Sequence, residues 1–355
     1  MTDKVTSNLI VTQKAPDITA ADKSIIIGLA YIRALAAALV VVTHLSGAYF
    51  MTPSENWDAS NFFGSFSRVC VPMFLMLTGA LFLKREEPLK YYYGKRLIRI
   101  ALPLVFWSVF WLAWLSQSGN APSNWALAII KGPVIFHMWY FYLLLSMSLG
   151  MPVFVKFYVN SEPREVWSVI LVWFFFCSLL PVIDPGHHVY GSDQAGVTNV
   201  INYSGYFLLG AALADLKISR SRAILLGGGL FAFGGGMTVI LTSWLTAKTG
   251  HASDFYYYYT SPAVVLASVG IFLAIANCKR GPKPLHLVLM VLSECSLGVY
   301  CLHILTLDRL RAAFGIIGGP ENAWIMIPVN AVLILLITVP VIYCMRLIKP
   351  LRSVA

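Results

Sequence analysis

Residues 28–50 read GLAYIRALAAALVVVTHLSGAYF, an almost unbroken apolar run that decides the fold class of the chain. Besides two tyrosines, its only ionisable side chains are Arg33 and His44. An α-helix of about 20 apolar residues spans the hydrocarbon core of a bilayer. Because the run is continuous and does not alternate as a barrel strand does, it predicts a membrane-spanning helix.

The two ionisable side chains of this run share one helix face. Arg33 and His44 are eleven positions apart, which at about 100° per residue is within about 20° of three full turns, with a rise of about 16 Å. Arg33 could reach lipid phosphates as a simple anchor, and His44 could be a packed histidine. Ionisable groups at such depth usually face a cavity, so the aligned pair favours a functional site.

The composition extends this interpretation to the whole chain. Of the 355 residues, 58% are hydrophobic and 12% charged, whereas an average soluble domain has about 25% charged residues. An ordinary soluble enzyme is therefore excluded. We predict an all-α, polytopic membrane helix bundle of about ten transmembrane helices. The ten spans are 25–50, 62–83, 100–118, 137–158, 167–183, 201–216, 223–247, 262–278, 287–306 and 324–347.

The basic residues predict the orientation of these spans. With both the N-terminus and the C-terminus cytosolic, twenty of the 26 Lys and Arg residues fall on the cytosolic side and four on the other, while Arg33 and Arg68 lie inside spans. Such an asymmetry follows the positive-inside rule. The net charge of +10 is therefore a topology signal, and we expect no nucleic-acid partner.

The chain divides into a flexible cytosolic tail (1–24), a transmembrane domain (25–347) and a cytosolic C-terminal tail (348–355). The first segment is polar and of mixed charge, unlike a cleavable signal peptide. The six cysteines form no CxxC pair, so neither a disulfide framework nor a metal site is expected. With no soluble domain, any chemistry must lie inside the bundle or at its mouths.

Five further strings accompany the arginine, ten residues and histidine of the first span. They are VPMFLMLTGALFLKR (71–85), YYYGKRLIRIALP (91–103), HMWYFYLLL (137–145), YFLLGAAL (206–213) and SLGVYCLH (296–303). In this order the chain resembles the acyltransferase-3 family of integral membrane acyltransferases. Two positions depart from the family pattern: Ala30 stands where the family often has an acidic residue, and Thr78 where it has serine.

The resemblance implies transfer of an acyl group, usually acetyl, from cytosolic acetyl-CoA to a sugar hydroxyl. The acceptor would be a surface glycan or its lipid-linked precursor, and no metal is implied. The protein would be a multi-pass protein of the bacterial inner membrane, with membrane lipid, acyl-CoA and the glycan as partners. The central cavity would be bordered by spans one, two, three and nine.

The polyanionic donor would need cations at the cytosolic mouth. Arg33 offers one, and Arg96 with Arg99, three residues apart, would offer two more on one helix side. Ordinary positive-inside residues are the alternative for the latter two. His44 would act as general base on the acceptor hydroxyl, or as a nucleophile through an acyl-imidazole.

Other candidates would line the cavity. Arg68 could pair with Glu294 or with a substrate oxyanion, or reach the outer headgroups. Trp139 could stack on the acceptor sugar or belong to an interfacial aromatic belt. A buried Glu294 needs a partner.

In the ninth span, Ser296, Tyr300 and His303 form one helical stripe that could line the cavity. Glu294 lies about half a turn out of phase with His303, so no dyad between these two residues is expected.

A second function class fits many of the same features. A secondary transporter or glycan-lipid exporter would also have about ten spans and buried arginine, histidine and glutamate residues. The alignment of Arg33 with His44 and the ordered strings favour the acyltransferase, and no inverted repeat is evident to favour the transporter.

Overall fold

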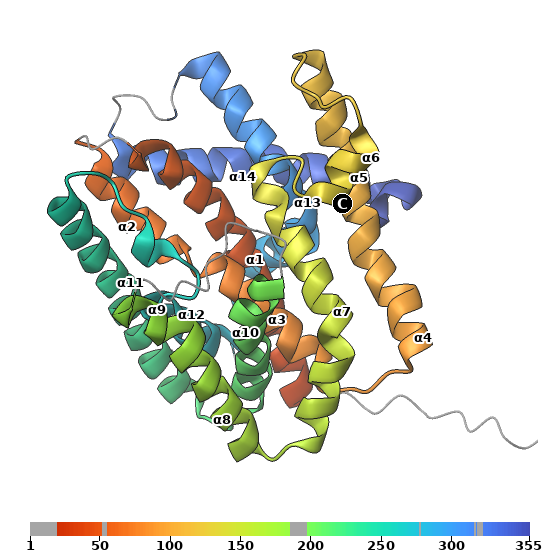
Figure 1. Ribbon diagram of the computed structural model, residues 1–355, viewed down its shortest axis with the longest axis vertical. Coiled ribbons are helices and arrows are strands. Elements are labelled where there is room, and N and C mark those ends of the chain that lie inside the picture. Colours follow the sequence, from red (N-terminus) through yellow and green to blue (C-terminus); the bar gives the residue numbers. More distant parts are fainter. Residues whose placement is uncertain (1–19, 52–54, 185–196, 277, 316, 318–321) are drawn as a thin grey trace, which may run out of the picture.

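Every predicted span is largely helical in the structure, a computed structural model that describes residues 20–51, 55–184, 197–276, 278–315, 317 and 322–355. No strand occurs among these residues, and the chain is an all-α bundle (Figure 1). The α-helices are α1 (Ala20–Phe50), α2 (Trp57–Ser67), α3 (Cys70–Phe82), α4 (Leu89–Tyr91), α5 (Ile98–Gln117), α6 (Trp125–Lys131), α7 (Trp139–Asn160), α8 (Pro163–Phe174), α9 (Leu180–Ile183), α10 (Val197–Asp215), α11 (Arg220–Thr249), α12 (Pro262–Ala276), α13 (Lys283–Phe314) and α14 (Ala323–Leu347).

Five short helical segments of tighter or wider pitch connect or extend the α-helices. Two are π-helical, η1 (Tyr92–Leu97) and η3 (Phe175–Leu179), and three are 3₁₀-helical, η2 (Phe136–Met138), η5 (Phe255–Tyr257) and η6 (Lys349–Ser353).

Nine helical segments of the described ranges are long and apolar enough to cross a membrane. The sixth predicted span, α10, is a helix too, but it is more polar than these nine. It packs against α3, α7, α8 and α12, and Tyr206 and Phe207 on it are fully buried. Because protein rather than lipid surrounds this helix, polar residues along it find partners.

The ends of the chain differ from the predicted tails. Residues 1–19 of the expected N-terminal tail lie outside the described residues, and α1 already begins at Ala20. The C-terminal stretch 348–355 forms the 3₁₀ turn η6 and packs against α5, where the Trp107 indole donates to the carbonyl of Val354 at 2.7 Å. The sequence offers no periodic signal for so short a docking segment.

The predicted loop 84–99 is mostly helical. After Pro88, α4 and η1 run without interruption into α5, so the third helix begins about ten residues before its apolar part. A helix need not end at the membrane surface, and the apolar pattern marks only its lipid-embedded part.

The second predicted span is broken into α2 and α3 at Arg68 and Val69. Pro72 lies four residues after Arg68 and has no N–H to bond the Arg68 carbonyl, which interrupts the helix there. The break is local, because Arg68 and Val69 both keep right-handed helical dihedral angles.

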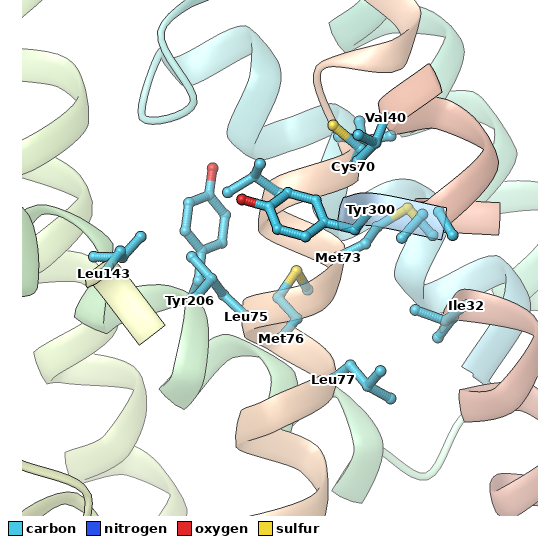
Figure 2. Packing of buried hydrophobic residues seen from close by; sticks show 14 of the residues in the cluster. Ile32, Val40, Cys70, Met73, Leu75, Met76, Leu77, Leu143, Tyr206 and Tyr300 are labelled. Atoms are coloured by element: carbon cyan, nitrogen blue, oxygen red, sulfur yellow. The ribbon is translucent and has the colours of Figure 1, made fainter. Parts of the chain in front are cut away.

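The centre of the bundle is a close crossing of α3 and α10. A Cβ on Gly79 would lie 1.9 Å from the Phe207 carbonyl oxygen, and a Cβ on Gly210 would lie 1.9 Å from that of Met76. Small residues at both contact points let the two backbones touch. Figure 2 shows α3 side chains such as Met73 packed against the neighbouring core.

In Figure 1, the α11–α12 pair lies at one side of the bundle and α5 at the other, with α1, α3 and α10 between them. α1 packs against α2, α3, α12, α13 and α14. The first span is therefore the helix around which the candidate site is built.

Candidate functional site

Arg33 and His44 both point into the protein from α1, and different residues surround the two side chains. Arg33 borders a cavity of about 610 Å³, which we call the basic cavity. His44, about three turns further along, packs against two other histidine rings. The aligned face of α1 thus connects a cavity with a histidine cluster.

The basic cavity is enclosed by α1, α3, α5, α7, α13, α14 and the C-terminal segment 352–355. The predicted borders, spans one, two, three and nine, are confirmed, and spans four and ten also contribute. Its volume is within the range of about 300–1,000 Å³ usual for small-molecule sites.

One end of the basic cavity is strongly cationic. Its four guanidinium groups are Arg33, Arg99, Arg346 and Arg352. Among the described residues, only Arg346 of these four has a carboxylate partner, Glu294, at 3.3 Å. The remaining three guanidinium groups are available to an anionic ligand, and arginine's planar fork suits phosphate oxygens.

The other end of the basic cavity is apolar and aromatic. Val40, Val71, Tyr140 and Tyr300 form its wall, and Val40 lies one helical turn before His44. Tyr300 separates the cavity from the histidine cluster: its hydroxyl donates to the carbonyl oxygen of His137. Figure 2 shows the Tyr300 ring beside Val40 and Cys70.

Three histidine rings from three elements lie close together next to Tyr300. The ring centroids of His44 and His303 are 5.1 Å apart, those of His137 and His303 5.3 Å, and those of His44 and His137 6.4 Å. His137 is 1% and His303 0% exposed, whereas His44 is half-buried. We call these three residues the histidine cluster.

Hydrogen bonding fixes the tautomer of His303. Its Nδ1 donates to the carbonyls of Tyr300 at 2.7 Å and Val299 at 3.0 Å. Because carbonyl oxygens only accept, the proton is on Nδ1. The buried Nε2 of His303 and both buried ring nitrogens of His137 make no hydrogen bond with the described residues.

Arg68 lies at the break between α2 and α3. Its guanidinium is 4.5 Å from the centroid of Tyr257 and 5.8 Å from that of Tyr259, and its Nε is buried without a hydrogen bond. The possible pairing with Glu294 is wrong, because Glu294 pairs with Arg346 at the opposite end of the basic cavity.

The comparison with known families concerns nearly the whole chain. Residues 26–347 match the sequence model of the acyltransferase-3 family, which is described as an acyltransferase domain. The chain belongs to the acyltransferase-3 family. It is therefore a multi-pass integral membrane acyltransferase. No curated protein and no solved structure matched the chain.

Two arginines that their spacing assigned to the donor lie apart in the structure. Arg99 borders the basic cavity, whereas Arg96 borders a neighbouring cavity of about 520 Å³ that shares Leu81 and Phe82 with it. Arg96 is held by both oxygens of Glu87, with Nε to Oε2 at 2.6 Å. The expectation that Arg96 and Arg99 lie on one side of the same helix is wrong. The π-helical turn η1 ends between the two residues and changes the angle between their side chains around the helix axis.

The stripe expected on the ninth span continues from the basic cavity to the histidine cluster. Ser296 and Tyr300 of α13 border the basic cavity, and His303 belongs to the histidine cluster. Glu294, half a turn out of phase with His303, has Arg346 as its partner. Trp139 borders neither part, and its ring stacks on Tyr259 at 5.8 Å.

Sequence reasoning missed three residues of this site: His137, Arg346 and Arg352. The two arginines were counted only as positive-inside residues, and their place at the end of the tenth span could have signalled a second basic patch. No periodic signal links His137 to the ninth span. Among the described residues, no group of three potential ligands has the arrangement of a metal site.

Proposed function

We propose that this acyltransferase moves an acyl group, most simply acetyl, from acyl-CoA to a hydroxyl of an extracytoplasmic or lipid-linked glycan. The observation that carries the proposal is the basic cavity, cationic at one end and apolar at the other, which ends one helical turn before His44. A CoA thioester has the same polarity, with phosphates at one end and a thin, weakly polar arm at the other.

Arg33, Arg99 and Arg352 would bind the phosphates of the donor by charge-assisted hydrogen bonds. The thioester arm would follow the apolar wall toward Tyr300. Because Tyr300 separates the cavity from the histidine cluster, we expect its ring to move when the thioester reaches His44.

His44 would be the general base. It takes the proton of the acceptor hydroxyl while the oxygen attacks the thioester carbonyl carbon. The C–S bond then breaks, and the CoA thiolate takes the proton from His44 as the ester is released. The half-buried position of His44 leaves part of its ring accessible to an acceptor.

Other residues have supporting roles in this proposal. Arg68, a cation beside His44 without a carboxylate partner in the described part of the chain, would stabilise negative charge on the carbonyl oxygen. Trp139, Glu294 and Ser296 would shape the acceptor and donor ends. The orientation in the bacterial inner membrane, with both ends of the chain cytosolic, is part of the same proposal.

Thermal stabilisation of the purified protein separates this function from a transporter. We expect acetyl-CoA and free CoA to raise the melting temperature, and a panel of ions and free sugars to have no such effect. Stabilisation by solutes or ions but not by CoA would support the transporter instead. A ping-pong pattern of initial rates together with a trapped acyl-histidine would show that His44 acts as a nucleophile and not as a general base.

A further inference from the structure

The ring of His303 is fixed in one orientation and one tautomer. Its Nδ1–H donates to two backbone carbonyls of its own helix, those of Val299 and Tyr300. The neutral imidazole therefore has its lone pair on Nε2, which points away from these carbonyls.

That lone pair has no partner. His303 is 0% exposed, and its Nε2 is among the buried polar atoms without a hydrogen bond. Buried side-chain acceptors are rarely left unpaired, because burial removes them from water without compensation. A fixed and unpaired acceptor in this position indicates a donor that arrives during function.

The groups facing His303 from other elements narrow the choice of donor. His44 of α1 lies at 5.1 Å and His137 of η2 at 5.3 Å between ring centroids. Arg68 lies against Tyr257, 4.5 Å from its ring centroid. His44 is half-buried and His137 is 1% exposed, so a proton from a substrate reaches His44 first.

We propose that His303 is a positioning residue whose Nε2 accepts a hydrogen bond from His44 when His44 carries the proton taken from the acceptor hydroxyl. This inference rests on the proposed function. His303 neither gains nor loses a proton: the proton moves from the hydroxyl to His44 and then to the CoA thiolate. In many enzymes a carboxylate accepts the hydrogen bond that orients the general base. A neutral imidazole such as His303 can accept the same bond without placing a permanent charge in the protein interior.

The pairing is tested by the pH dependence of His44 labelling with diethyl pyrocarbonate, a small reagent that acylates neutral imidazole. Mass spectrometry of the full-length protein in nanodiscs follows His44 separately from the other histidines. In His303→Asn, which lacks an acceptor at the Nε2 position, we expect the labelling midpoint of His44 to move about one pH unit or more to lower pH. The midpoint moves to lower pH because protonated His44 no longer has the acceptor that stabilises it.

His303→Gln places a carbonyl oxygen near the Nε2 position, and we expect it to restore the midpoint to within a few tenths of a pH unit. His251→Asn is the matched control, because His251 is an exposed histidine in the loop after α11. We expect it to leave the labelling midpoint of His44 unchanged. If His303→Asn does not fold, His303→Phe keeps the ring without nitrogens and takes its place.

An unchanged His44 midpoint in folded His303→Asn or His303→Phe overturns the pairing. An equal shift in His137→Asn also overturns it, because the effect would then belong to the whole histidine cluster. The measurement needs no acceptor or transfer activity. Loss of the proposed function would appear separately, as unchanged transfer in His44→Ala.

Discussion

At the scale of single residues, the site is defined by cations and imidazoles without ordinary partners. Arg33, Arg99 and Arg352 border the basic cavity, and none of them has a carboxylate partner in the described part of the chain. Ionisable groups inside a membrane bundle are costly unless they bind something. Their ligand is therefore expected to be anionic.

Arg99→Ala and Arg96→Ala form a matched pair on one helix. Arg99 faces the basic cavity, and Arg96 is neutralised by Glu87. We expect Arg99→Ala to raise the dissociation constant of acetyl-CoA about tenfold or more, because a hydrogen bond to a charged group contributes about 1.5–3 kcal/mol. Arg96→Ala should change it by less than about threefold. Calorimetric titration measures both, and equal weakening would contradict the separation of the two arginines.

The Glu87–Arg96 pair makes a pH-dependent contribution to stability. The hydrogen bond from Arg96 holds the pKa of the Glu87 carboxyl below its usual value. Its stabilisation is therefore complete above the unfolded pKa of about 4.3 and is lost as the pH falls through the lower folded pKa. We expect Glu87→Gln to have a lower melting temperature than the wild type at pH 7, with no difference well below pH 4. A constant difference across this range would exclude the ion pair as its cause.

The residues that sequence reasoning found are those that one helix brings together. The phase of Arg33 and His44 follows from the continuous helix α1, and Ser296 with Tyr300 follows from α13. The contact of His137 with His303 depends on how η2 docks on α13, and no helical period encodes it.

At the scale of elements, close backbone contacts and one helix break position the site. Gly79 and Gly210 let α3 touch α10, and Pro72 accounts for the break that places Arg68. Apolar runs predicted where the helices are, but they predicted neither the break nor the helical part of 84–99. Those features depend on single prolines and on polar residues outside the membrane.

Gly79→Ala is expected to destabilise the α3–α10 crossing. The added Cβ would lie 1.9 Å from the Phe207 carbonyl oxygen, a backbone atom that cannot rotate away. We expect a loss of about 1–3 kcal/mol, seen as a lower melting temperature. Gly228→Ala, where a Cβ meets nothing within 4 Å, is the control. Equal melting temperatures of the two variants would contradict the crossing.

At the scale of the whole molecule, the uneven distribution of lysine and arginine predicts ten crossings with both ends on one side. This count requires α10 to cross, although it is more polar than the nine helices that qualify by hydropathy. The basic cavity would then open toward the same side as the C-terminal segment, where Arg352 borders it.

Single-cysteine labelling from the two sides of the membrane tests the crossings. Glu86→Cys, before α4, and Ser219→Cys, before α11, should react from the same side, and Ser253→Cys, after α11, from the other. Each is made in a background in which all six native cysteines are replaced, since Cys344 is exposed and Cys278 partly so. If Glu86→Cys and Ser219→Cys react from opposite sides, α10 does not cross and the predicted topology is wrong.

The central claim is that α1 holds the donor with Arg33 and performs the transfer with His44. Acetyl-CoA binding and acetyl transfer measured side by side on His44→Ala and Arg33→Ala test it most directly. The account predicts that His44→Ala binds acetyl-CoA with unchanged affinity and transfers at least about a hundredfold more slowly, whereas Arg33→Ala binds about tenfold more weakly. A His44→Ala protein that still transfers at the wild-type rate, or an Arg33→Ala protein with undiminished donor binding, would contradict it.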